Sequence, residues 1–384
     1  MYKLLTYPLN IALILFFGLM LSLLKYSYFY ETPNFYDILL IIVIIIPYVI
    51  LSLFFKRSDA QVKINFDCAS SEESRYLETR SLYMISISLV GFIIEFIYGG
   101  LPILVGREVA RTIPFFHVLF YSMTLCSVLY AVIFSSKKIV IICLMFASLI
   151  SILTMSRQLI MVVFMIALIA FFSKHSITKK SFCYLLLSIV FVIIAFGFLG
   201  NLRQSLSGDF VDNYIQIVGG ATEKGEKIGD ILFWIWLYIS SPIYNLIFNY
   251  NTYIFSEPDI FKVDGLFFYS NILPDTISKY LYDGFKIDLV MAHLNVGTGY
   301  AAAIRNLGLL GFLLLLIYQL LFYIVFLTIV DNKHKLMIVT YFSALSFFMI
   351  FDNLFVRAEF VFVFIIVFLS SHLKLKVVRP YKLD

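Results

Sequence analysis

Residues 312–330 read FLLLLIYQLLFYIVFLTIV, one of the most apolar runs in a chain of 384 residues. A helix needs roughly 20 predominantly apolar residues to cross the hydrocarbon core of a bilayer, and this uncharged run has that length. The whole chain has the same character, because 61% of its residues are hydrophobic, 14% are charged and the mean hydropathy is +0.95. We therefore expect an all-α polytopic integral membrane protein.

Further runs of similar size precede and follow this stretch, which predicts about ten transmembrane helices in total. The fifth and sixth runs are separated only by the short sequence SRQ. The predicted spans are 4–24, 36–55, 81–98, 114–134, 139–155, 158–172, 182–199, 308–330, 336–351 and 358–372.

The distribution of basic residues predicts the orientation of these spans. With both termini in the cytoplasm, the inner segments hold 17 of the 29 Lys and Arg residues, as the positive-inside rule requires. The first run could pass for a signal peptide, but it is long and no small-residue cleavage site follows, so we expect a retained span. The segment 56–80 is expected to be a solvated cytoplasmic loop of mixed charge.

Three regions follow from this topology. An N-terminal bundle of about seven helices occupies 1–199, one large extracytoplasmic loop occupies 200–300, and 301–384 holds the last helices and a basic cytoplasmic tail. The loop is acidic, with eleven Asp and Glu against six Lys and Arg. Its one apolar stretch, 231–250, is expected to be an interfacial or re-entrant helix with Trp234 and Trp236 at the headgroup level, because a full span would turn the basic tail outward.

Arginines concentrate on the side where the positive-inside rule should deplete them. Of ten arginines, six fall at the predicted outer ends of spans. They could snorkel to lipid headgroups or pair with nearby carboxylates. Their guanidinium groups also match phosphate oxygens, so together they predict a site for a phosphorylated lipid. The six candidate phosphate-binding residues are Arg107, Arg111, Arg157, Arg203, Arg305 and Arg357.

Few other side chains suggest chemistry. Glu95 lies near the outer end of the third predicted span, where an ionisable group is a candidate for catalysis or a structural partner for an arginine. The four cysteines have neither metal-ligand nor disulfide spacing, and no metal or Walker motif occurs, so no metal and no cofactor are expected. The scattered basic residues give no support for nucleic-acid binding.

The segment 293–311, HLNVGTGYAAAIRNLGLLG, leads into the opening span. Its GTGYAA core matches the dinucleotide-binding pattern G-x-G-x-x-A. That motif needs a preceding strand and a crossover unit, whereas this one closes a loop and opens a lipid-embedded helix. We expect the glycines to allow close backbone approach, either to a neighbouring helix or to a sugar-diphosphate headgroup.

About ten spans, a large outer loop before the last three helices and arginines at outer helix ends resemble the bacterial Wzy-type oligosaccharide repeat-unit polymerases of O-antigen and capsule, and the related O-antigen ligases. These families tend to carry a His-Asn pair, then Arg or Glu, then Gly and an apolar helix. The corresponding residues here are His293, Asn295, Arg305, Gly308 and Gly311, and the His-Asn pair is interrupted by a leucine. The resemblance implies a fold like that of the C-type membrane glycosyltransferases, without their acidic metal motif.

The resemblance implies en bloc glycosyl transfer at the outer face of the bacterial plasma membrane. The donor is a growing glycan on undecaprenyl diphosphate, the acceptor is one repeat unit on the same lipid, and a chain-length regulator and a flippase are possible partners. A ring of arginines would stabilise the departing diphosphate. His293 is the first candidate for a general base and Glu95 the second. Asn295, Gly297, Gly299 and Gly308 would shape the site.

Other functions stay open at this point. An O-antigen ligase would use the same donor with a lipid A-core or protein acceptor. A flippase or other transporter usually shows internal repeats and broken helices, and neither is evident here. A non-catalytic scaffold would leave the six outer arginines without a role.

Overall fold

The computed structural model describes residues 2–58, 71–105, 109–174, 214–255, 265–281 and 287–372, apart from His293 and Asn295, together with Cys183 and Leu187. In this part of the chain the regular elements are helices, and the only β-type pairing is an isolated bridge between Ser27 and Ala221. The predicted all-helical fold is therefore confirmed for the described residues.

The N-terminal half contains eight α-helices in the described residues before 175. They are α1 (Tyr2–Leu5), α2 (Leu9–Ser22), α3 (Phe35–Ser58), α4 (Ser71–Gly99), α5 (Pro102–Val105), α6 (Pro114–Phe134), α7 (Lys137–Leu153) and α8 (Arg157–Lys174), of which α1 and α5 are single turns.

The remaining helices include both long and short elements. They are α10 (Tyr214–Val218), α11 (Glu223–Lys227), α12 (Asp230–Phe255), α13 (Gly265–Asn271), α14 (Asp275–Leu281), α15 (Ala301–Ile329), α16 (Lys335–Phe347) and α17 (Ala358–His372), with 3₁₀ turns at Asn332–His334 (η2), Phe348–Ile350 (η3) and Leu354–Val356 (η4).

Six helical segments are long and apolar enough to cross a membrane, within the described residues. They lie in α3, α4 with α5, α6, α8, α12 and α15, and two shorter apolar helices are α2 and α17. Large apolar side chains such as Phe16, Leu53 and Ile97 are exposed on their outer faces, as expected for surfaces that meet lipid. These helices agree with a membrane protein, whereas the number of about ten spans stays a prediction.

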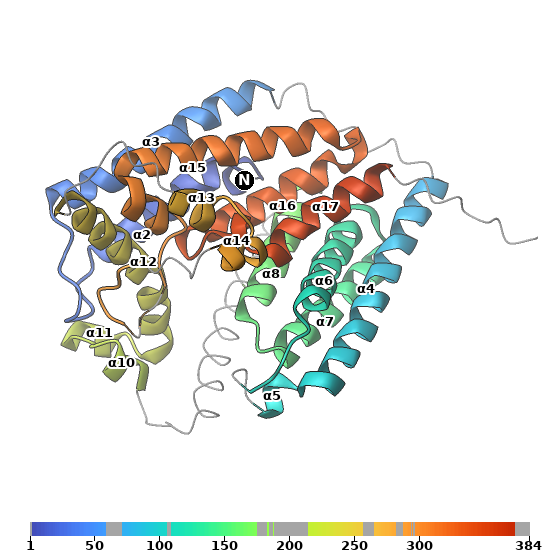
Figure 1. Ribbon diagram of the computed structural model, residues 1–384, viewed down its shortest axis with the longest axis horizontal. Helices are drawn as coiled ribbons and strands as arrows, with labels where there is room; N and C mark the ends of the chain where they lie inside the picture. The colour runs from blue at the N-terminus through green and yellow to red at the C-terminus, as the bar shows by residue number, and fades with distance from the viewer. Residues whose placement is uncertain are drawn as a thin grey trace, which may run out of the picture.

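Figure 1 shows how the helix ends are arranged. The C-terminal ends of α15 and α17 and the N-terminal end of α4 lie toward the upper right, and the C-terminal end of α3 lies at the top. The helices α5, α10 and α11 lie at the lower edge of the molecule. These four ends, which were predicted to be cytoplasmic, lie away from α5, α10 and α11 in this view, whereas the N-terminus lies nearer the centre of the picture.

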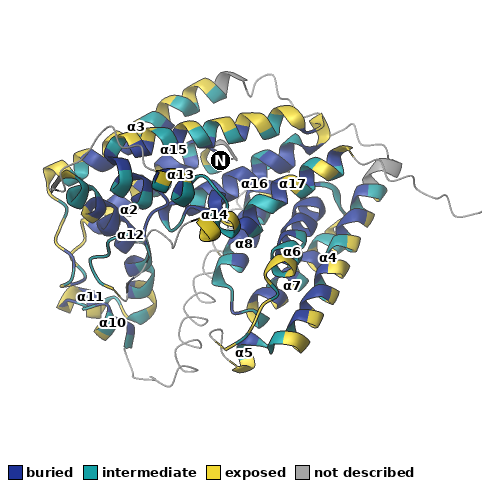
Figure 2. Cartoon of the chain, in the orientation of Figure 1, coloured by how far each residue is buried: buried dark blue, intermediate teal, exposed yellow. Residues whose placement is uncertain are grey.

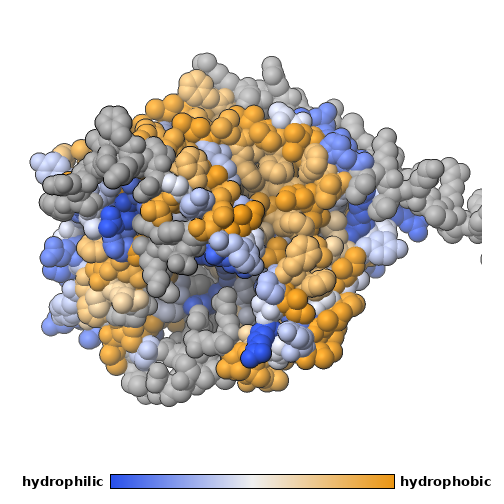
Figure 3. Space-filling view, in the orientation of Figure 1, coloured by the Kyte–Doolittle hydropathy of each residue, from blue (hydrophilic) through white to orange (hydrophobic). Residues whose placement is uncertain are grey.

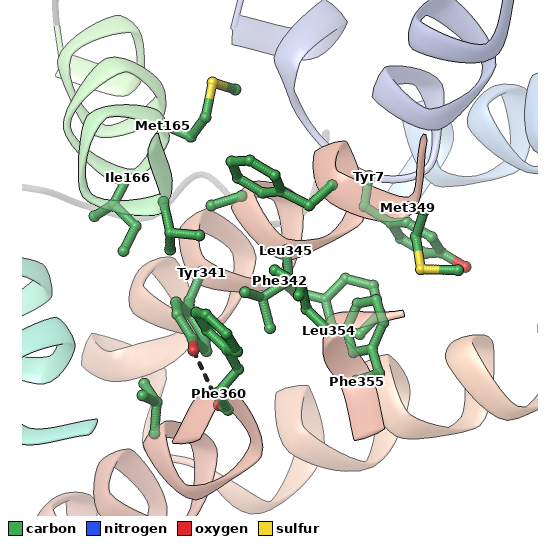
Figure 4. Close-up of a cluster of buried hydrophobic side chains, with 14 of the residues drawn as sticks. Tyr7, Met165, Ile166, Tyr341, Phe342, Leu345, Met349, Leu354, Phe355 and Phe360 are labelled. Carbon is green, nitrogen blue, oxygen red and sulfur yellow. Dashed lines mark hydrogen bonds between the residues drawn. The ribbon is translucent and has the colours of Figure 1, made fainter. Parts of the chain in front are cut away.

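The core lies where α16 and the turns η3 and η4 pack between α2, α6, α8 and α15. Figure 2 shows α6 and α16 largely buried, while α3 and α15 expose one face. Figure 4 shows the centre of this core, in which the rings of Phe342 and Phe355 lie 4.6 Å apart and Tyr341 donates a hydrogen bond of 2.9 Å to the carbonyl oxygen of Phe360.

Small polar side chains join the helices inside this core. The Ser122 hydroxyl of α6 donates to the Glu359 carbonyl oxygen of α17 at 2.7 Å, and the Asn10 amide of α2 donates to the Ser343 carbonyl oxygen of α16 at 2.7 Å. Since lipid is as apolar as a leucine side chain, helices in a membrane associate through close packing and bonds of this kind, worth about 0.6 kcal/mol each on average. These contacts fix which helices are neighbours.

Several predicted boundaries were wrong. The segment 56–80 is not a continuous loop, because α3 extends to Ser58 and α4 begins at Ser71 with the helix-favouring sequence SEESRYLETR. The first predicted span is broken before Pro8 into α1 and α2. Helical structure already begins at Ala301, and the non-helical backbone of Gly308 (φ +58°, ψ −142°) divides α15 into two helical parts at the position where a span was predicted to begin. The predicted span 182–199 lies outside the described residues apart from Cys183 and Leu187.

The predicted outer loop contains five helices in its described part, α10 to α14. The apolar run 231–250 falls in α12, a helix of 26 residues with Pro242 inside it, which packs along α2 and α15. Its length and composition would allow it to cross a membrane. Its interpretation as an interfacial or re-entrant helix stays a prediction.

Candidate functional site

Two buried asparagines hold the segment that precedes α15. The Asn245 side chain of α12 donates to the Val296 carbonyl oxygen at 2.7 Å and accepts from the Val290 amide at 3.0 Å. One helical turn later, Asn249 donates to the Asp288 carbonyl oxygen at 2.7 Å and accepts from the Asp288 amide at 3.0 Å. Both asparagines are completely buried. The described residues of 287–300, which we call the junction segment, are thus docked on one face of α12.

Three glycines allow this packing. An added Cβ at Gly297 would lie 2.2 Å from the Ile287 side chain, and one at Gly299 would lie 3.0 Å from the Asn353 amide nitrogen. The Gly299 amide donates to the Met349 carbonyl oxygen at 2.8 Å. At Gly308 the backbone has φ +58° and bends α15 against the ring of Tyr253. The glycines therefore approach neighbouring protein, and the segment before α15 contains no strand in its described residues.

Arg305 lies in the first turns of α15 and forms an ion pair with the junction segment. Its Nε donates to Asp288 Oδ2 at 2.5 Å, and the two side chains are 28% and 39% exposed. Asp288 is held in place at its own backbone by Asn249, as described above. The guanidinium group is therefore presented at the surface by two elements that are themselves fixed.

Arg357 lies between η4 and α17 and is surrounded by two aspartates. Its Nη2 lies 2.8 Å from Asp352 Oδ2, and its Nη1 lies 3.6 Å from Asp275 Oδ2 at the start of α14. The carboxylate of Asp352 raises the pKa of the guanidinium group. Asp275 also accepts from the Ala358 amide at 3.1 Å, so it stabilises the first turn of α17.

Hydrogen bonds of asparagine side chains link the neighbourhoods of the two arginines, and Asn271 Nδ2 also donates to Ser270 Oγ at 2.8 Å. The Asn306 side chain donates to Ser270 Oγ of α13 at 3.2 Å, and the Asn353 side chain donates to the Asn271 carbonyl oxygen at 3.2 Å. We call these residues, together with the two arginines and their aspartate partners, the polar belt. Figure 3 shows hydrophilic residues at the border of a hollow near the position of α14. The polar belt consists of Ser270, Asn271, Asp275, Asp288, Arg305, Asn306, Asp352, Asn353 and Arg357.

Two buried atoms near the polar belt have no hydrogen-bond partner in the described structure, Asn271 Oδ1 and Thr298 Oγ1. Asn271 is completely buried, and Thr298 is 4% exposed. A buried polar group without a partner costs free energy that a bound water or ligand hydroxyl would recover. The belt thus combines charged groups for an anion with neutral groups for hydroxyls.

Glu95 is buried in α4 and faces His117 of α6. Both carboxylate oxygens lie 3.1 Å from His117 Nδ1, and the Ile113 amide donates to Oε1 at 3.1 Å. The Glu95 side chain is 4% exposed and that of His117 is 28% exposed. Sequence reasoning selected Glu95 but missed its partner.

The Glu95–His117 pair adjoins the polar belt at the start of α17. Ser122, which is on α6 with His117, donates to the Glu359 carbonyl oxygen. The Glu359 carboxyl group interacts electrostatically with both His117 and Arg357. The acid–histidine pair and the second arginine pair therefore belong to one neighbourhood.

The other predicted arginines are placed differently. Arg157 begins α8 after a turn in which Met155 has φ +52°, and its guanidinium carbon lies 5.9 Å from the ring centre of Trp234 and 5.4 Å from that of Tyr238, both on α12. Arg111 is exposed, and its backbone amide donates to the Gly99 carbonyl oxygen at 3.0 Å. The predicted site residues Arg107, Arg203, His293 and Asn295 lie outside the described residues.

Among the described residues, no group of three His, Cys, Asp or Glu side chains could hold a metal ion. Cys126 and Cys143 are buried free thiols, and Cys183 is exposed. In the described part of the candidate site, Arg305 and Arg357 carry positive charge.

Comparison with known proteins identifies no relative: no family model matches the chain, and no curated protein or solved structure matches it. The arrangement of the residues themselves is therefore the basis for a functional assignment.

Proposed function

We propose that the protein is a membrane glycosyltransferase that polymerises undecaprenyl-diphosphate-linked oligosaccharide repeat units into O-antigen or capsular polysaccharide. The observation that carries this proposal is the polar belt, in which Arg305 and Arg357 meet three aspartates next to the Glu95–His117 pair. The belt lies in an all-helical protein with several apolar helices long enough to span a bilayer.

The reaction follows from general chemistry. A hydroxyl oxygen of the acceptor repeat unit forms a bond to the anomeric carbon of the donor glycan. The bond between that carbon and the diphosphate oxygen breaks, the hydroxyl proton passes to a base, and undecaprenyl diphosphate leaves. Preorganised cations stabilise the charge that develops on the leaving group.

The arginines of the belt are suited to this task. A guanidinium group can exchange a carboxylate for a phosphate with little change in geometry, because both present paired oxygens to its planar donors. In the absence of substrate, Asp288, Asp275 and Asp352 neutralise the guanidinium groups and hold them in position. When the diphosphate binds, the carboxylates give up one or more of these donors.

The location of the belt supports an outer-face reaction. It is formed by the start of α15, the start of α17 and helices of the predicted extracytoplasmic loop. The C-terminal ends of α3, α15 and α17 and the N-terminal end of α4, all predicted to be cytoplasmic, lie elsewhere in the molecule (Figure 1). In this proposal the protein resides in the bacterial plasma membrane with both termini in the cytoplasm. It acts with a flippase and a chain-length regulator.

The proposal is tested in cells that lack the gene and carry a plasmid copy. Arg305→Lys and Arg357→Lys keep the charge but lose the planar pair of donors, so we expect at least about a 100-fold loss of chain extension at normal protein levels. The matched control is Arg75→Lys, at an exposed position near the N-terminal end of α4, whereas Glu95 lies near the C-terminal end of that helix.

The surface glycan is separated on a gel. The proposal expects a ladder with wild type and with Arg75→Lys, and a single repeat unit with the other two variants. Full ladders from all variants would contradict the role of the belt. Loss of all surface glycan in cells without the gene, in place of single-repeat product, would point to the ligase or the flippase instead.

A further inference from the structure

We infer that His117 is the general base of this reaction and that Glu95 is its positioning residue. The inference rests on the proposed function and assigns the proton transfer to a residue pair inside the described bundle. Four observations carry it: the hydrogen bonds around Nδ1, the packing of the ring, the state of Nε2 and the charges nearby.

The hydrogen bonds fix the proton on one ring nitrogen. Both oxygens of the buried Glu95 carboxylate lie 3.1 Å from His117 Nδ1, so Nδ1 carries the hydrogen that points at them. The Ile113 amide donates to Glu95 Oε1 at 3.1 Å and so helps to hold the carboxylate in place. In the neutral ring the lone pair is therefore on Nε2.

The ring is also held mechanically. Phe92 of α4 lies perpendicular to the His117 ring with centroids 5.9 Å apart, and Tyr121, one turn along α6, lies 5.9 Å away on a tilted plane. Phe92 is 1% exposed and Tyr121 is 4% exposed, so both are rigid supports. An imidazole with this support does not need to reorient before it accepts a proton.

Nε2 is available for a ligand. Within the described residues, the hydrogen bonds of the His117 ring are those that Nδ1 makes with Glu95, and the side chain keeps 28% of its surface exposed. A buried carboxylate that orients a partly exposed imidazole is the arrangement that turns histidine into an effective base for a hydroxyl group.

The charges around His117 suit a reaction in which an anion departs nearby. Glu95 faces it from α4, and Glu359 interacts with it from α17, where Arg357 also acts on Glu359. These two carboxyl groups stabilise the imidazolium that forms, and Arg357 is the guanidinium group that would receive the diphosphate. No charged group on α6 itself, in its described residues 114–134, competes with this arrangement.

The step balances as follows. The acceptor hydroxyl gives its proton to Nε2 while its oxygen bonds to the anomeric carbon, and the bond from that carbon to the diphosphate breaks. The imidazolium then returns its proton to solvent through its exposed edge. Glu95 keeps its contacts with Nδ1 throughout and passes no proton to the substrate.

The test uses the purified full-length protein in lipid vesicles with an undecaprenyl-diphosphate-linked repeat unit. The variants are His117→Gln and Glu95→Gln, and the control is His372→Gln, an exposed histidine at the last residue of α17. We expect a loss of kcat of about 100-fold or more for His117→Gln with KM little changed, a smaller loss for Glu95→Gln, and none for the control.

The pH profile separates this role from a structural one. The wild-type rate should fall on the acid side as the imidazole becomes protonated, and this limb should disappear in His117→Gln. Wild-type kcat and an unchanged acid limb in a folded His117→Gln protein would overturn the inference while the proposed function stands. Absence of any polymer from wild type would instead refute the proposed function.

A second measurement avoids the risk that a variant fails to fold. Wild-type protein is treated with diethyl pyrocarbonate, and modification of each histidine is followed by mass spectrometry. Activity should fall in step with modification of His117, and bound lipid-linked substrate should slow both. Full activity after complete modification of His117 would overturn the inference.

Discussion

Replacing Asn245 by alanine should release the junction segment from α12. The asparagine makes three hydrogen bonds to that segment, with the Val290 amide and the Val296 and Leu294 carbonyl oxygens. Alanine leaves the Val290 N–H and the Val296 C=O without their partner in a half-buried position. A cost of about 1.5 kcal/mol for each, in the range for unsatisfied polar groups, gives about 3 kcal/mol in total.

Hydrogen exchange measures this change directly. Since about 1.4 kcal/mol corresponds to a factor of ten in an equilibrium constant, the opening of the segment should become roughly 100-fold more frequent. Exchange at the amides of Val290 and Asp288, followed by mass spectrometry in detergent, should accelerate by about that factor.

The control for this experiment is Asn251→Ala. Asn251 is half-buried on the same helix and has no hydrogen bond to the described residues of the junction segment. Its replacement should leave exchange at Val290 unchanged. Equal protection in wild type and Asn245→Ala would refute the claim that this asparagine docks the segment.

Three further outcomes are expected. Gly308→Ala should lower the thermal stability in detergent by more than Gly229→Ala. Both glycines have positive φ, but only at Gly308 would the new Cβ meet a ring, 2.3 Å from Tyr253. Equal melting temperatures would contradict the close packing of the bend. Asp288→Asn should weaken the ion pair that positions Arg305, so that the protein still folds but KM for the lipid-linked donor rises. A kinetic assay in vesicles measures this KM. An unchanged KM would show that the ion pair has no role in substrate binding. Chain extension should persist in EDTA, since arginines supply the positive charge, and a complete loss restored by a divalent cation would contradict this.

The apolar helices could be predicted from sequence because their signal is local. A run such as 114–134 has the length and composition of a span, and Pro114 at the first helical position marks where α6 begins. The break between α7 and α8 was also predicted, at the sequence SRQ. Boundaries were missed where helix continues through charged residues, as it does after Ser71.

The candidate site was only partly accessible from sequence. Arg305 and Arg357 were selected because an arginine at an outer helix end is unusual, and that signal requires no partner. Their partners Asp288 and Asp275 lie 17 and 82 positions away in the chain and gave no local pattern. His117 escaped notice for the same reason, since its spacing of 22 residues from Glu95 matches no motif. Contacts of this kind depend on which helices become neighbours, and that is decided by packing over the whole bundle.

The most direct test of the proposed polymerase activity is a reaction with two purified components. Full-length protein in lipid vesicles receives a single undecaprenyl-diphosphate-linked repeat unit, and the products are separated by length. The proposed polymerase should produce a ladder of two, three and more repeat units and release undecaprenyl diphosphate, and Arg357→Lys should lower the yield of these products at least about 100-fold. A folded wild-type protein that leaves the repeat unit unextended, or an Arg357→Lys variant that makes the full ladder, would contradict it.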